Sequence, residues 1–131
     1  MKPHAIYVAD ATMFSHVFGP AEQHELAARL QVIAPPYTAA DLQGNGGRFE
    51  GVSILISSWT PPVLDDPMLD RLPDLKAIFH AAGSVKPFVT DAVWRRGIRV
   101  SSAARVNAIP VAEFTFSQIV FCLKQIGRAH V

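Results

Sequence analysis

A run of small residues between a predicted strand and the next predicted helix could hold an anion through its backbone. Residues 80–85 read His-Ala-Ala-Gly-Ser-Val, and small side chains let the main chain approach a ligand closely. The N–H groups of Gly83 and Ser84 could donate charge-assisted hydrogen bonds to a carboxylate and fix its orientation. By composition alone, a tight strand-to-helix connection without a ligand is the simpler interpretation.

Two further side chains fall where they could contact the same ligand. Asn107 comes three residues before Pro110, where it could cap the last predicted helix or point its amide toward a substrate. Trp59 follows the strand predicted over 52–56, so its ring could wall a pocket at the carboxyl edge of the sheet or simply cover loop backbone. The candidate substrate-binding residues are therefore Gly83, Ser84, Asn107 and Trp59.

Other chemistries find less support in the sequence. His80 ends a predicted strand, and the pKa of a histidine side chain suits a general base. Cys122 lies on an apolar helix pattern, which predicts a buried, reduced thiol. Residues 44–47 read Gly-Asn-Gly-Gly, but Phe49 stands where a dinucleotide fingerprint needs its third glycine. No spacing of His and Cys is typical of a metal site. We therefore assign no cofactor-binding or metal-binding residue.

Composition limits the kind of protein that this sequence encodes. The chain has 131 residues, half of them hydrophobic, and a net charge of +1. This length suits one compact domain, and the scattered charges predict no nucleic-acid partner and no anionic membrane partner. The apolar stretches look strand-sized, and Asp10 interrupts the N-terminal run before it resembles a signal peptide. We expect a soluble cytoplasmic protein.

The elements that position these residues follow an alternating pattern. Short apolar runs predict strands over 5–9, 31–34, 52–56, 75–79 and 98–101. Helix signals lie at 20–30, 38–42, 65–72 and 90–96, and Pro110 is expected to begin a last helix over 110–124 with Glu113 in its first turn. The alternation predicts an α/β fold: a flavodoxin-like, doubly wound parallel sheet in three αβα layers, with a protruding C-terminal helix.

The segment 72–124 carries several features in a fixed order. It begins Leu-Pro-Asp-Leu-Lys-Ala-Ile, continues through the turn at Gly83 to Asn107, and then reads Val-Ala-Glu over 111–113. In this order the segment resembles the D-isomer-specific 2-hydroxyacid dehydrogenases. The resemblance is strongest over 72–124 and only topological over 2–51.

The resemblance implies roles for the candidate residues. Gly83 and Ser84 match the family's carboxylate-binding pair, and Asn107 matches the Asn with which formate-dehydrogenase-like members hold substrate. Lys86 departs from the pattern, because the family often has an Asp there. His80 is not the implied base, since the family's acid/base His, its Arg and its Glu all lie further downstream. No catalytic residue is therefore assigned within this chain.

The implied reaction is hydride transfer between NAD or NADP and a small 2-keto or 2-hydroxy acid. The implied organisation is a substrate-binding domain over 1–104 and a linker with an interdomain helix over 105–124, followed in the family by the domain that binds the cofactor. We expect the chain alone to be inactive and to form a homodimer through the helix at 110–124. Residues 126–131 equal one translation of a common sequencing adapter, so 125–131 is expected to be a non-native tail.

A non-enzymatic module is the alternative function. Flavodoxin-like receiver or binding domains share this alternation and length. A receiver needs an Asp at the end of its third strand to accept phosphate, whereas the third predicted strand runs into Ser57 and Ser58. This difference favours the dehydrogenase interpretation.

Overall fold

The computed structural model of the 131-residue chain describes residues 2–33, 36–44 and 47–126. Strands and helices alternate along it. The strands are β1 (His4–Val8), β2 (Gln31–Val32), β3 (Val52–Ser57), β4 (Ala77–His80) and β5 (Arg99–Ser102). The helices are α1 (Ala11–Val17), α2 (Pro20–Arg29), α3 (Ala39–Gly44), α4 (Asp66–Asp70), α5 (Asp91–Arg95) and α6 (Ala104–Leu123).

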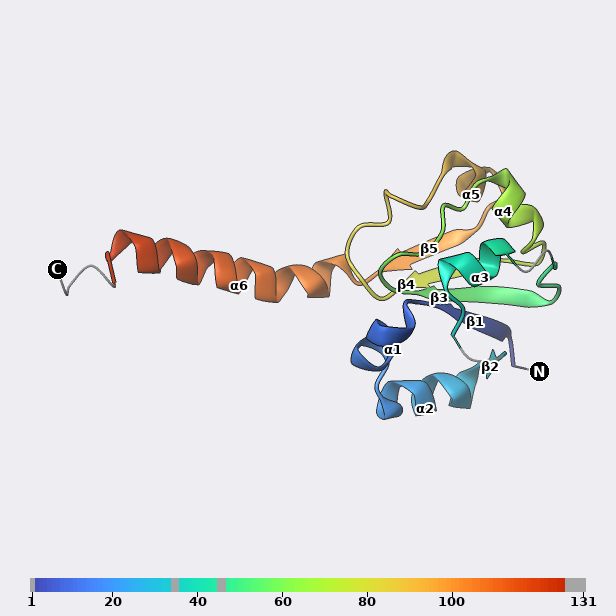
Figure 1. Cartoon of the computed structure of the whole chain (residues 1–131), viewed down its shortest axis with the longest axis horizontal. Helices are drawn as coiled ribbons and strands as arrows, with labels where there is room; N and C mark the ends of the chain where they lie inside the picture. The colour runs from blue at the N-terminus through green and yellow to red at the C-terminus, as the bar shows by residue number, and fades with distance from the viewer. Residues whose placement is uncertain (1, 34–35, 45–46, 127–131) are drawn as a thin grey trace.

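The five strands form one sheet in the order β2-β1-β3-β4-β5, and all neighbouring strands are parallel. This is the strand order of flavodoxin-like doubly wound domains. Figure 1 shows α1 and α2 on one face of the sheet and α3, α4 and α5 on the other, which gives three layers. The predicted fold class is confirmed.

Each face of the sheet has its own apolar core. The larger core packs the sheet against α3, α4 and α5, whose buried contributions include Leu42, Leu69 and Val93. The smaller core lies under α1 and α2, where the rings of Tyr7 and Phe18 are 5.0 Å apart. Because Leu69 is fully buried, its truncation to Ala would cost about 2 to 5 kcal/mol of folding free energy.

The short helices begin and end where the local sequence directs them. The Asp65 carboxylate accepts the Met68 N–H at 3.0 Å and caps α4. The Thr90 hydroxyl accepts the Ala92 N–H at 3.2 Å and caps α5. Beyond α5, Gly97 has a φ of 68°, a left-handed conformation that glycine adopts without strain. The predicted starts of α4 and α5 and the predicted stop of α5 at Gly97 are confirmed, whereas α4 ends at Asp70, two residues before the predicted Leu72.

The helix α1 was not predicted from the sequence. Asp10 forms its cap by accepting the Thr12 N–H at 2.8 Å. The hydrogen bonds from the Thr12 side chain and backbone also hold the pKa of the Asp10 carboxyl below its usual value. Phe14 of this helix packs against Tyr7 with ring centroids 5.0 Å apart, so a tertiary contact supports a helix too short to be stable alone.

Other differences from the predicted elements are small. The strands begin or end one or two residues away from the predicted positions, and β2 has only two residues. Ala34, the predicted end of that strand, lies outside the described residues, as do Asn45 and Gly46 of the rejected glycine-rich loop.

The prediction that Pro110 begins the last helix is wrong. The helix α6 begins at Ala104 and contains Pro110 in its interior, so the predicted linker at 105–109 is already helical. Pro110 cannot donate a backbone hydrogen bond to the preceding turn. The prediction failed because proline is enriched at the first position of helices, and Pro110 was therefore interpreted as a helix start. As a consequence, Glu113 lies near the middle of α6 and not in its first turn.

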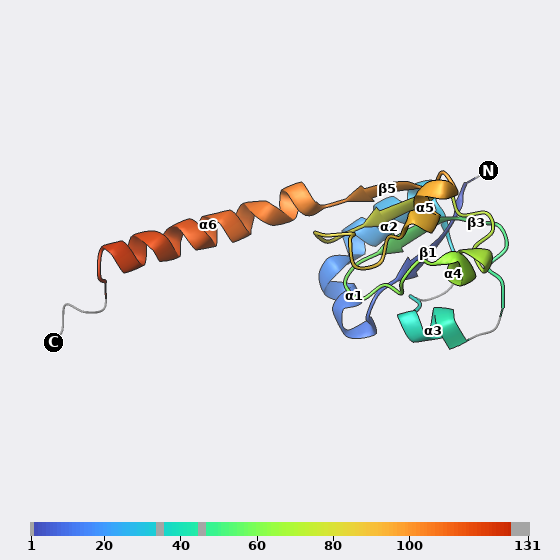
Figure 2. The same cartoon turned by 90° about the horizontal axis from the view of Figure 1, so that it is seen from above.

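The helix α6 protrudes from the domain and buries none of its residues. Figures 1 and 2 show it leaving the carboxyl edge of the sheet and running away from the layers. The prediction that Cys122 is buried is therefore wrong, since its thiol is free and exposed. The expectation of only strand-sized apolar stretches is also wrong. By length and composition alone, α6 could cross a membrane.

Candidate functional site

The loop after β4 and the start of α6 are joined by backbone hydrogen bonds at the carboxyl edge of the sheet. The Ala103 N–H lies 3.0 Å from the His80 carbonyl oxygen and 3.1 Å from that of Ala82. One turn further on, the Asn107 N–H donates to the Ala103 carbonyl at 2.8 Å. These contacts fix the first turn of α6 beside the loop that contains Gly83 and Ser84.

The structure places Gly83 and Asn107, two of the candidate substrate-binding residues, next to each other. A Cβ atom built on Gly83 would lie 3.5 Å from Nδ2 of Asn107. Because Asn107 is in the first turns of α6 and its N–H is bonded to Ala103, it is not the cap of the helix. Its side-chain amide contributes two donors and an acceptor next to the loop.

Within the described residues, the N–H groups of Gly83 and Ser84 donate to no other residue. Gly83 is half-buried and Ser84 is exposed, so neither residue is closed off from solvent. The Ser84 hydroxyl accepts the Lys86 N–H at 3.3 Å, which holds the loop in a turn despite the unusual lysine. Two adjacent free N–H donors beside an amide side chain form an arrangement that can hold a carboxylate.

Trp59 lies at the same edge of the sheet, in the loop after β3, with 48% of its surface exposed. The next residue, Thr60, has a φ of 62°, which is strained for a β-branched residue and costs about 1 to 3 kcal/mol. The Thr60 hydroxyl donates to the Trp59 carbonyl at 2.7 Å. The ring is available to a ligand, but no contact joins Trp59 to Gly83 or Asn107 in the described structure.

A buried hydrogen bond between Ser57 and His80 was missed in the sequence. Ser57 Oγ and His80 Nδ1 lie 2.9 Å apart, and the register of β3 and β4 pairs the two residues directly. Burial lowers the pKa of His80, and its ring packs against Phe88 with centroids 4.8 Å apart. Each residue directly follows a predicted strand, at 52–56 and 75–79, but their pairing depends on the register between the two strands, which the sequence does not state.

This environment gives His80 a structural role at the end of β4, where the loop begins. Only 5% of its surface is exposed, and its carbonyl is one of the two that receive the Ala103 N–H. The described residues contain no group of three or more His, Cys, Asp or Glu side chains that could hold a metal ion.

Fold and site together define a flavodoxin-like α/β domain with a small polar cradle at the carboxyl edge of its sheet. No profile of a known protein family matches the chain, and no curated protein sequence matches it.

Proposed function

We propose that this chain is the substrate-binding part of an NAD(P)-dependent D-2-hydroxyacid dehydrogenase. The observation that carries the proposal is the proximity of Gly83 and Asn107, with a Cβ on Gly83 only 3.5 Å from Nδ2 of Asn107. These residues are 24 positions apart in the sequence, and both are candidate substrate-binding residues from the order of motifs over 72–124. The flavodoxin-like strand order supports the same assignment.

In this proposal the chain positions the substrate, and other groups carry the chemistry. The Gly83 and Ser84 N–H groups hold the carboxylate of a small 2-keto or 2-hydroxy acid, and the Asn107 amide fixes its orientation. Trp59 is proposed as a wall of the same site. A nicotinamide bound by a separate nucleotide-binding domain would exchange the hydride. His80 is buried and bonded to Ser57, which leaves acid/base catalysis to that domain.

A ligand titration of the 131-residue chain tests the carboxylate cradle. We expect millimolar pyruvate to shift the amide NMR signals of Gly83 and Ser84 and the side-chain amide signals of Asn107. Asn107→Ala and Ser84→Pro should each weaken binding about tenfold or more, because one charge-assisted hydrogen bond contributes about 1.5 to 3 kcal/mol. Ser84→Pro removes a backbone donor, which other side-chain replacements leave in place.

The matched control is Gln118→Ala, which removes an amide from the same helix but away from the loop. Its affinity should equal that of the unchanged chain. Circular dichroism must first show that each variant is folded. Equal affinity in all variants, or signal shifts that avoid this loop, would contradict the proposed site.

A receiver-type module is the second candidate, because such domains share the observed strand order. The position that should carry the phosphate acceptor holds Ser57 and Ser58, and both are fully buried. Asp10 is already bonded to Thr12 as a helix cap. Incubation with acetyl phosphate and Mg²⁺, followed by intact mass measurement, should therefore show no phosphorylated protein. A phosphorylated aspartate would favour the receiver interpretation.

A further inference from the structure

Among the residues that the structure describes, no helix covers half of one face of the sheet. The helices α1 and α2 cover the part of this face formed by β1, β2 and β3, while β4 and β5 lie beyond them. Phe79 stands in the middle of β4 with 48% of its surface exposed, although β3 and β5 pair with it on both sides. Parallel sheets are normally covered on both faces. The uncovered half therefore needs a partner.

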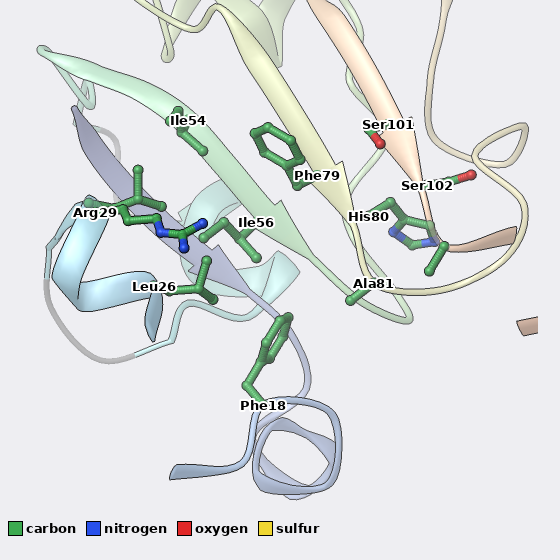
Figure 3. A pocket seen from close by; sticks show the side chains of 12 residues that line it. Phe18, Leu26, Arg29, Ile54, Ile56, Phe79, His80, Ala81, Ser101 and Ser102 are labelled. Atoms are coloured by element: carbon green, nitrogen blue, oxygen red, sulfur yellow. The ribbon is translucent and has the colours of Figure 1, made fainter. Parts of the chain in front are cut away.

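The uncovered half forms the floor of an apolar groove of about 470 Å³. Figure 3 shows the ring of Phe79 on this floor between Ile54 and Ser101, with Leu26 of α2 on one wall. Ser102 and Ala103 line one end of the groove. The groove therefore opens at the place where α6 leaves the sheet.

The same chain carries a helix, α6, that no other described element covers. Exposed apolar side chains occur on every side of α6, and its 20 residues bury nothing. A helix that is apolar all round is normally buried all round. In one copy of the chain, α6 cannot turn back into the groove while Ala103 keeps its backbone hydrogen bonds to His80 and Ala82. Figure 2 shows the resulting course of α6, away from the sheet.

We propose that two copies of this chain exchange their α6 helices, so that the C-terminal half of each α6 lies in the sheet-face groove of the other copy. The two helices then run antiparallel, side by side, from one domain to the other. Each arriving helix enters its groove beside Ala103, where the resident α6 begins. This arrangement is two-fold symmetric and closed. The proposal rests on the two apolar surfaces of the described chain and not on the proposed dehydrogenase activity.

The area available is close to what a specific dimer needs. A 20-residue helix is about 30 Å long and about 10 Å wide, so its lateral surface is about 900 Å². Burying half of it contributes about 450 Å² per copy, to which the groove residues that it covers add their own exposed surface. Standard interfaces bury about 800 Å² per partner. Specific dimers bury about 1,200 to 2,000 Å² in total. We expect this interface to lie at the lower end of that range and the dimer to form at micromolar concentrations.

The sequence of α6 favours a second copy over a lipid bilayer. Glu113 lies near the middle of the helix, where a bilayer would place it in the centre of the hydrocarbon. Charged residues at that depth are costly and rare. In the exchanged dimer, the middle of α6 lies between the two domains, where Glu113 can keep contact with water.

Cys122 offers a direct test, because it is the only cysteine and lies in the last turn of α6. One preparation carries a nitroxide spin label on Cys122 and no isotope label. A second preparation carries ¹⁵N and the substitution Cys122→Ser. In the mixture, we expect the label to broaden the amide signals of Phe79 and Ser101 and to leave that of Trp94 sharp, because Trp94 lies on α5 at the opposite face.

A pair of matched substitutions tests the groove independently. Phe79→Glu introduces a charge into the groove and should raise the dimer dissociation constant about tenfold or more in analytical ultracentrifugation. Trp94→Glu makes the same change at a residue of similar exposure, 54%, and should leave the dissociation constant unchanged. Ser101→Lys provides a second groove variant if Phe79→Glu does not fold.

Three outcomes would overturn the proposal. The first is a chain that stays monomeric at about 100 µM. The second is a dimer in which broadening is confined to α6 and Phe79→Glu has no effect, which would indicate helix-to-helix contact alone. The third is a chain that does not dimerise and binds vesicles of phosphatidylcholine, which would assign α6 to a membrane.

Discussion

Nδ2 of Asn107 lies 3.5 Å from the position that a Cβ atom would take on Gly83. This is an ordinary van der Waals distance, so a methyl group fits there. Gly83 also has no positive φ, unlike Gly51 and Gly97. Neither space nor backbone conformation therefore requires a glycine at this position, although the resemblance implies that its small size serves a ligand.

Replacing two glycines by alanine should distinguish a glycine that the backbone conformation requires from one that it does not require. Gly83→Ala should leave stability unchanged or raise it by up to about 1 kcal/mol, since alanine restricts the unfolded chain. Gly97→Ala should lower stability by about 1 to 2 kcal/mol, because its φ of 68° is left-handed although nothing lies within 4 Å of the added atom. Urea unfolding of both variants provides the measurement. Equal losses would show that the loop at Gly83 is under backbone strain.

The fold was predictable where local chemistry and tertiary packing agree. Thr90 and Gly97 mark the two ends of α5 in the sequence, and the structure uses both. The start of α6 was not predictable from the same rules. Pro110 carries a strong helix-start signal, but the contact that begins the helix is the backbone bond of Ala103 to the β4 loop, and no residue type identifies such a bond.

The hydroxyl group of Tyr7 is expected to destabilise the domain. Its hydroxyl is buried without a hydrogen-bond partner among the described residues, and burial raises its pKa. Because an unsatisfied buried polar group costs about 1 to 3 kcal/mol, Tyr7→Phe should raise the free energy of unfolding by about 1 kcal/mol. Tyr37→Phe is the control and should change it less. A loss of stability in Tyr7→Phe would mean that the hydroxyl is hydrogen-bonded in solution.

The buried His80 should make stability depend on pH. Desolvation lowers its folded-state pKa, so near pH 6 the unfolded chain binds more protons than the folded chain at this residue. Stability should be full above the unfolded pKa of about 6.5 and fall as the pH drops toward the folded pKa. Denaturant unfolding from pH 7.5 to 5 should show this slope. His80→Gln should flatten it, and the exposed His16→Gln should not.

The proposed function also predicts that this chain does not bind the cofactor. Its sequence contains no GxGxxG motif, so a pyrophosphate would lack the glycine turn and helix N-terminus that usually hold it. Calorimetric titration with NADH should show no binding and no reduction of pyruvate should be detected. Micromolar affinity would contradict the assignment of the cofactor to another domain.

A shortened chain ending at Arg105 should be monomeric and equally stable. The helix α6 buries no residue against its own domain, so its removal takes away few contacts that the domain needs. We expect light scattering to give a monomer at tens of micromolar, and the melting temperature to stay within about 4 °C of that of the full chain's monomer. A much lower melting temperature would show that α6 packs on its own sheet.

The candidate site was predictable in part. The order of motifs points to Gly83 and Asn107 as candidates, and the structure places these two residues next to each other. The bond between Ser57 and His80 was missed because it depends on the register of β3 against β4, which the sequence does not state. Trp59 was placed at the correct edge of the sheet, but the strained Thr60 beside it has no sequence signal.

The pairing of β1 with β3 has a consequence for synthesis of the protein. β1 lies at the N-terminus, and Ser53 Oγ of β3 donates to the carbonyl of His4 across 49 positions of sequence. At about 5 to 20 residues per second, a ribosome needs roughly 2 to 10 seconds to make that stretch. During this time the apolar strand β1 lacks β3, its neighbour in the sheet. A nascent chain would need a chaperone, or its own α1 and α2, to shield β1 from water.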